Sequence, residues 1–114
     1  MQNLTWAAPI LPGKLDAWHR FNEEMQGPRR AEHDASGREM GIHREVVSLM
    51  QTPMGDFVCL YHEADDLTKA FAVLATSDTP YLQWFRERAF EIHGLTPEML
   101  LGPPPAERVF DWRG

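Results

Sequence analysis

Two segments rich in β-branched and aromatic residues, 42–52 and 57–63, lie on either side of the sequence TPMGD near the middle of the chain. Two such runs separated by a short turn that contains glycine are typical of a β-hairpin. A two-residue loop of Met54 and Gly55 would force Met54 to positive φ, which is unfavourable for a residue with a side chain. We therefore expect a three-residue loop, with Gly55 in the left-handed conformation after a type I turn.

This loop pairs Thr52 with Asp56 and thereby determines which side chains share a face of the hairpin. One face would hold a mostly apolar set that includes a few polar groups: Arg44, Val46, Ser48, Met50, Val58, Leu60 and His62. Because this face is mostly apolar, we place it under the helices. A few polar groups on an apolar wall are also the composition expected of a ligand pocket. His43 and Glu45 would then point the other way, into a polar ladder that faces a second subunit, and could not share a metal site with His62.

Helical patterns flank the hairpin, and a further strand is predicted toward each end of the chain. The predicted elements are strands over 4–10 and 107–112, helices over 14–26 and 28–40, and helices that begin after the N-caps Asp66 and Thr79. The order of strand, helix, hairpin, helix and strand is the split βαβ, or ferredoxin-like, pattern. We therefore expect one α+β domain over residues 1–114, with βαββαβ order and a four-stranded antiparallel sheet.

Charge and cysteine content exclude several classes of partner. The formal net charge is −6 and the basic residues are scattered, which disfavours binding to nucleic acid or to an acidic membrane surface. No apolar stretch approaches the length of a membrane helix, and the first ten residues lack the pattern of a signal peptide. Cys59 is the only cysteine, so no internal disulfide can form and a reducing cytoplasm fits best.

The predicted sheet has one face that its helices cannot cover. Pairing two such sheets is a common way to bury this surface, so we expect a homodimer. The segments PILPGK, GIHREVV, SDTPYLQWF, EIHG and VFDW resemble those of an uncharacterised bacterial group within the dimeric α+β-barrel superfamily, which is distantly similar to antibiotic-biosynthesis-type monooxygenases. The resemblance implies a pocket between sheet and helices that takes aromatic or other small organic molecules. No catalytic motif of those monooxygenases is present to be carried over.

Histidine is the side chain best suited to proton transfer near neutral pH. His62 on the hairpin and His93 at the end of the helix after Thr79 are the predicted catalytic pair. The predicted ligand-binding residues are His19, Trp18, Arg44, Ser48, Tyr81 and Phe85. The alternative is that the histidines are unrelated and individually hydrogen-bonded, with His93 interacting with the last carbonyls of its helix.

These observations predict a small dimeric protein with a mainly apolar pocket that binds a small organic molecule. If it is an enzyme, we expect a cofactor-free monooxygenase or an isomerase-like enzyme, with no cofactor and no metal. The alternative is a non-catalytic dimeric module for binding or structure.

Overall fold

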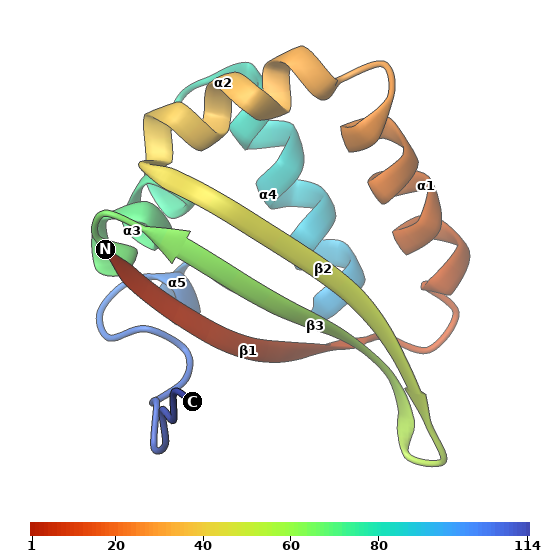
Figure 1. Cartoon of the computed structure of the whole chain (residues 1–114). Coiled ribbons are helices and arrows are strands. Elements are labelled where there is room, and N and C mark those ends of the chain that lie inside the picture. Colours follow the sequence, from red (N-terminus) through yellow and green to blue (C-terminus); the bar gives the residue numbers. More distant parts are fainter.

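The computed structural model describes residues 1–114 and has an α+β fold. A three-stranded antiparallel sheet in the order β1-β3-β2 lies against helices that all pack on one of its sides (Figure 1). The strands are β1 (Gln2–Ile10), β2 (Ile42–Thr52) and β3 (Gly55–Ala64). The helices are α1 (Leu15–Gln26), α2 (Arg30–Met40), α3 (Leu67–Thr76), α4 (Pro80–His93) and α5 (Pro97–Leu100). None of the helices is both long enough and apolar enough to cross a membrane.

The predicted fourth strand does not form, so the expectation of a four-stranded ferredoxin-like sheet is wrong. Residues 107–112 adopt no regular structure, and Val109, Phe110 and Trp112 are 75% to 87% exposed. A strand requires a ladder of backbone hydrogen bonds, and none joins this segment to β1. The contact with β1 comes instead from the Arg108 guanidinium, which donates to the backbone and side-chain oxygens of Asn3.

The predicted hairpin is present, but its register differs by one residue from the predicted one. Thr52 pairs with Gly55, so the loop consists of Pro53 and Met54 alone. The Thr52 hydroxyl closes this short loop, because it accepts from the Met54 amide at 3.1 Å and donates to the Gly55 carbonyl at 2.8 Å. Gly55 takes the positive φ, at 129°, and Met54 avoids it.

The shift of one residue exchanges the two faces of β2. The helix-facing residues of β3 pair with Glu45, Val47 and Leu49: the pairs are Glu45–His62, Val47–Leu60 and Leu49–Val58. Val58 and His62 are buried under the helices. Since directly opposed side chains lie on the same face, Glu45 points to the helices and not to the polar ladder that we predicted.

The edge of β2 is irregular at its first residues. The pairing steps from Ile42–Ala64 to Arg44–Glu63, which leaves His43 without a partner in β3. The His43 ring instead contacts the Asp65 carboxylate at 2.7 Å. His43 and Glu45 therefore have different partners, although they are two residues apart.

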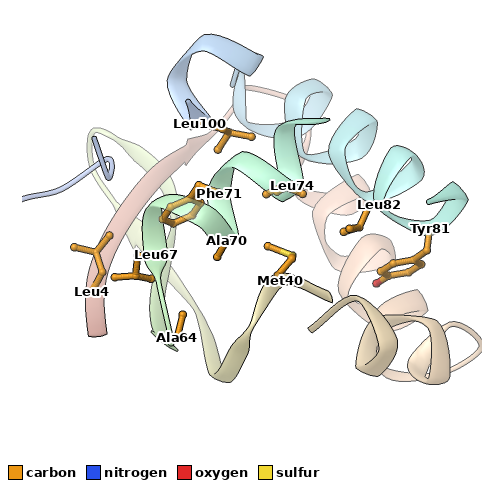
Figure 2. Close-up of a cluster of buried hydrophobic side chains, with 10 residues drawn as sticks. All are labelled: Leu4, Met40, Ala64, Leu67, Ala70, Phe71, Leu74, Tyr81, Leu82 and Leu100. Carbon is orange, nitrogen blue, oxygen red and sulfur yellow. The ribbon is translucent and has the colours of Figure 1, made fainter. Parts of the chain in front are cut away.

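Two apolar clusters form the core between the sheet and the helices. One cluster joins β1, α3, α4 and α5 (Figure 2), and includes Leu4, Phe71 and Leu82. The other joins α1 and the end of α4 to the sheet, and includes Trp18, Phe21 and Ile92. Three partly buried aromatic residues pack against both clusters: Trp6, Trp84 and Phe85. Polar side chains between the sheet and the helices therefore lie between these two apolar clusters.

Candidate functional site

A cavity of about 960 Å³ lies between the helices and the inner face of the sheet. Of the 37 residues that line it, 21 are hydrophobic. Exposed residues of α1 and β2, among them His19 and Val47, border the cavity and mark where it opens to the surface. A concave and mainly apolar space of this size is suited to a small organic molecule.

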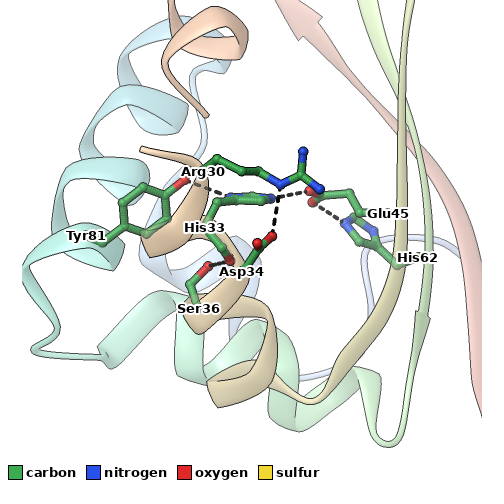
Figure 3. Close-up of polar contacts among 7 residues, drawn as sticks. All are labelled: Arg30, His33, Asp34, Ser36, Glu45, His62 and Tyr81. Atoms are coloured by element: carbon green, nitrogen blue, oxygen red, sulfur yellow. Dashed lines mark hydrogen bonds and ion pairs between the residues drawn. The ribbon is translucent and has the colours of Figure 1, made fainter. Parts of the chain in front are cut away.

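A chain of hydrogen-bonded side chains runs from Tyr81 to Trp6 beside this cavity, and Figure 3 shows its part from Tyr81 to His62. The Tyr81 hydroxyl on α4 lies 2.7 Å from Nδ1 of His33 on α2. Nε2 of His33 lies 2.9 Å from Oε1 of Glu45 on β2. The other carboxylate oxygen of Glu45 lies 3.1 Å from Nε2 of His62 on β3, and the Trp6 indole N–H on β1 donates to Nδ1 of His62 at 3.2 Å.

The two ends of this chain determine which way every hydrogen bond points. An indole nitrogen can only donate, so Nδ1 of His62 must accept and Nε2 must carry the proton that it donates to Glu45. Tyr81 is buried, and Nδ1 of His33 is the one hydrogen-bond partner of its hydroxyl, so we assign the hydroxyl as the donor. His33 therefore also donates from Nε2 to Glu45. Both imidazoles are neutral in this arrangement, and the charge of the chain is that of Glu45.

The pKa values of the two acidic groups agree with this assignment. Burial acts to raise the pKa of Glu45, but hydrogen bonds from His33 and His62, with the charges that these rings carry in acid, lower it to about 2. Burial and the negative charge of Glu45 raise the pKa of Tyr81 well above its ordinary value. Near neutral pH, Glu45 is therefore a carboxylate and Tyr81 is a neutral phenol that donates.

The direction of these hydrogen bonds also opposes metal coordination by His33 and His62. A metal ion on Nε2 of His62 would require that nitrogen to lose its proton, and the ring proton would then move to Nδ1. Nδ1 would face the Trp6 N–H, so two donors would meet. The hydrogen bonds from His33 and His62 are instead suited to stabilise the ionised Glu45 carboxylate.

His93 lies in the same cavity lining but has a different environment. Its Nδ1 contacts the Pro9 carbonyl at 2.8 Å, and because a carbonyl only accepts, Nδ1 carries the proton. Nε2 makes no hydrogen bond and is not sealed from solvent. Burial lowers the pKa of His93, although the hydrogen bond to Pro9 acts to raise it. His93 thus presents a free lone pair at neutral pH.

The two histidines predicted to act together lie toward different ends of the cavity. His62 is opposite Leu4 on β1, whereas His93 binds Pro9, five residues farther along the strand. At the rise of a β-strand this separation is roughly 17 Å. Because these strand positions are far apart and both nitrogens of His62 are engaged, we assign separate roles to His62 and His93.

The other predicted residues divide between the cavity and the opposite face of the sheet. His19, Trp18 and Phe85 line the cavity, and Tyr81 contributes its hydroxyl to the polar chain. The prediction that Arg44 and Ser48 share a face with His62 is wrong, because the hairpin register differs by one residue. Ser48 lines a separate hollow of about 410 Å³ on the outer face. Arg44 borders the cavity, as predicted, but its guanidinium lies over the ring of Tyr61.

Sequence reasoning assigned no role in the pocket to Trp6, His33 or Glu45. A two-residue loop at Pro53 and Met54 would have indicated Glu45, because it then alternates with Val47 and Leu49 on the face of His62. His33 and Trp6 become visible only once helix α2 and strand β1 are placed beside that face, since no local pattern links them to it.

Comparisons of the chain with protein-family models, with curated proteins and with solved structures found no match. The function must therefore be inferred from the cavity, from the hydrogen-bonded side chains between Tyr81 and Trp6, and from His93.

Proposed function

We propose that this protein binds a small and largely apolar organic molecule in the cavity, and that His93 removes a proton from it. The observation that carries the proposal is the unengaged Nε2 of His93 in the cavity lining. Removal of a proton from a carbon acid is a first step available to both cofactor-free isomerases and cofactor-free oxygenases. His62 then has a positioning role, because both of its nitrogens are engaged.

A general base must be unprotonated, oriented and within reach of its substrate. Burial keeps His93 neutral near pH 7 by lowering its pKa, and the Pro9 carbonyl orients the ring. In the proposed step a C–H bond next to a carbonyl breaks and its proton moves to Nε2. The electron pair stays on the substrate as an enolate.

Hydrogen–deuterium exchange at carbon tests this step without knowledge of the natural substrate. A panel of small apolar ketones that includes 2-indanone would be incubated with the protein in D₂O, and loss of the α C–H signals followed by NMR. We expect exchange faster than in buffer alone, and we expect His93→Gln to lower the acceleration about 100-fold or more. The control is His19→Gln, at the exposed rim of the cavity.

Equal exchange rates in the wild type and in His93→Gln would contradict the assignment of His93. The second candidate function is a non-catalytic binding module. The observation in its favour is that all the groups of the Tyr81–Trp6 chain satisfy one another. Ketones that bind the wild type but exchange no faster than in buffer would support this candidate.

We also propose that the protein is a homodimer that forms through the outer face of the sheet. Val46 and Met50 are exposed there, beside an apolar hollow that Ala7 and Cys59 help to line. Arg44 and Glu63 are paired on this face, so a two-fold arrangement can match each charge with its opposite. The free thiol of Cys59 is in keeping with a reducing cytoplasm.

A further inference from the structure

We propose that the ligand of the cavity carries a protonated amine and that this group binds the Glu45 carboxylate. The inference rests on the proposed function, since it takes the cavity to be a ligand site, and it names the chemical class of the ligand. It is drawn from the charge of the polar chain, the free acceptor positions on Glu45 and the aromatic side chains around it.

The first step is that no cation of the protein neutralises Glu45. Its two partners, His33 and His62, are neutral when the donors at the ends of the chain are satisfied. No lysine or arginine pairs with this carboxylate.

Four arginines border the cavity, and none of them pairs with Glu45. Arg44 lies over the ring of Tyr61, and Arg38 forms no ion pair with Glu45. Arg30 pairs with Asp34 at 3.0 Å (Figure 3), and Arg86 donates to the carbonyls of Leu74 and Ser77. The Glu45 carboxylate is thus left without a lysine or arginine partner on a mainly apolar wall.

The second step is that Glu45 can still accept hydrogen bonds. An ionised carboxylate has about four acceptor positions, and the two imidazoles occupy one on each oxygen. The Glu45 side chain keeps 23% of its surface exposed and lines the cavity. An ammonium group that enters the cavity can therefore donate to Glu45 without displacing either histidine. Such charge-assisted bonds are roughly twice as strong as neutral ones.

The third step is that aromatic rings surround the chain. Trp6 and Phe71 lie with their ring centroids 6.3 Å and 6.0 Å from that of His62, and Phe85 lies 6.1 Å from His33. All three line the cavity. Aromatic faces attract cations, and their apolar surface also packs against the hydrocarbon part of an amine. An anionic ligand would be repelled by Glu45 at the same place.

Three ligands of the same size but different charge test the inference: benzylamine, benzyl alcohol and benzoate. Their dissociation constants would be measured by calorimetry near pH 7, and the Trp6 indole N–H resonance would report whether they bind beside the chain. We expect benzylamine to bind about tenfold or more tightly than benzyl alcohol, and benzoate to bind most weakly. Glu45→Gln should reduce the affinity for benzylamine to that for benzyl alcohol, and leave the affinity for benzyl alcohol within about twofold.

The matched control is Glu87→Gln, the same change at an exposed position of α4, which should keep the preference for the amine. Equal affinities of the wild type for benzylamine and benzyl alcohol would overturn the inference but leave the cavity as a ligand site. This comparison does not depend on whether Glu45→Gln folds. A preference for benzylamine over benzyl alcohol that survives in Glu45→Gln would overturn the inference as well. If none of the three ligands binds, the inference is overturned, and the exchange assay with ketones decides the proposed function separately.

Discussion

Glu45 shows how the neighbours of one residue determine the chemistry of a cavity wall. It lies between two imidazoles. Nδ1 of His62 accepts from the Trp6 indole N–H, and we assign Nδ1 of His33 as the acceptor of the Tyr81 hydroxyl. Trp6 and Tyr81 thus act on Glu45 without touching it, because they determine which nitrogen of each histidine carries the proton. The carboxylate is stabilised by two N–H donors and keeps its full charge.

The lowered pKa of Glu45 predicts a loss of stability in acid. Its folded-state pKa of about 2 lies below the ordinary value of 4.5, so its contribution is complete above about pH 4.5 and is lost as the pH falls toward 2. The contribution is on the order of 3 kcal/mol. Urea unfolding at several pH values should show a steeper decline for the wild type than for Glu45→Gln. If the free energy of unfolding declined with the same slope in both proteins, the environment assigned to Glu45 would be contradicted. The control is Glu87→Gln, which should decline as the wild type does.

At the level of the elements, the hairpin of β2 and β3 determines what the cavity contains. A register shifted by one residue would remove Glu45 from the cavity and bring Ser48 into it. The side chain of Thr52 closes the two-residue loop that selects the observed register.

A cross-strand disulfide tests this register directly. Ser48 lies opposite Cys59, and directly opposed residues have the Cα separation that a disulfide requires. We expect Ser48→Cys to form an intramolecular disulfide with Cys59 on mild oxidation, as measured by mass spectrometry and thiol titration. Leu49→Cys should not form one, because Leu49 lies opposite Val58 on the other face. A disulfide in Leu49→Cys and none in Ser48→Cys would indicate the register with a three-residue loop.

Local signals predicted many elements correctly. Asp66 caps α3 by accepting from the Lys69 amide, and Gly94 ends α4 in the left-handed conformation, both as predicted. The register was not predictable by the same reasoning, because it depends on side-chain hydrogen bonds of Thr52 within the loop. The last strand was predicted from β-propensity in residues 107–112, but propensity does not supply a partner strand.

The candidate site was predictable only in part. His62, His93 and His19 do line one cavity, as the sequence suggested. The actual partners of His62 come from two other elements, with Trp6 on β1 and Glu45 on β2. Such long-range contacts follow from the packing of the elements and leave no spacing in the sequence that would reveal them.

At the level of the whole molecule, the helices cover one face of the sheet and leave the other uncovered (Figure 1). The uncovered face carries apolar side chains from all three strands, among them Ala7, Val46 and Cys59. Burial of apolar surface favours association at about 25 cal/mol per Å², so this face is where we expect a second copy to bind.

The proposed dimer predicts a change of mass in solution when a charge is placed on this face. We expect the wild type to sediment as a dimer in analytical ultracentrifugation. Val46→Lys should shift it to a monomer, because an unpaired ammonium would be buried in the interface. Met54→Lys, at the exposed tip of the hairpin, should leave the dimer unchanged. A monomeric wild type at micromolar concentration would contradict the dimer.

The central claim is that both histidines beside Glu45 are neutral, with Nδ1 accepting and Nε2 donating. The most direct test is ¹⁵N NMR of the imidazole nitrogens near pH 7, with His33→Gln and His62→Gln used to assign the signals. The account predicts an unprotonated Nδ1 and a protonated Nε2 for both rings. Protons on both nitrogens of either ring would contradict it, because the Glu45 charge would then be neutralised within the protein and no amine would be required.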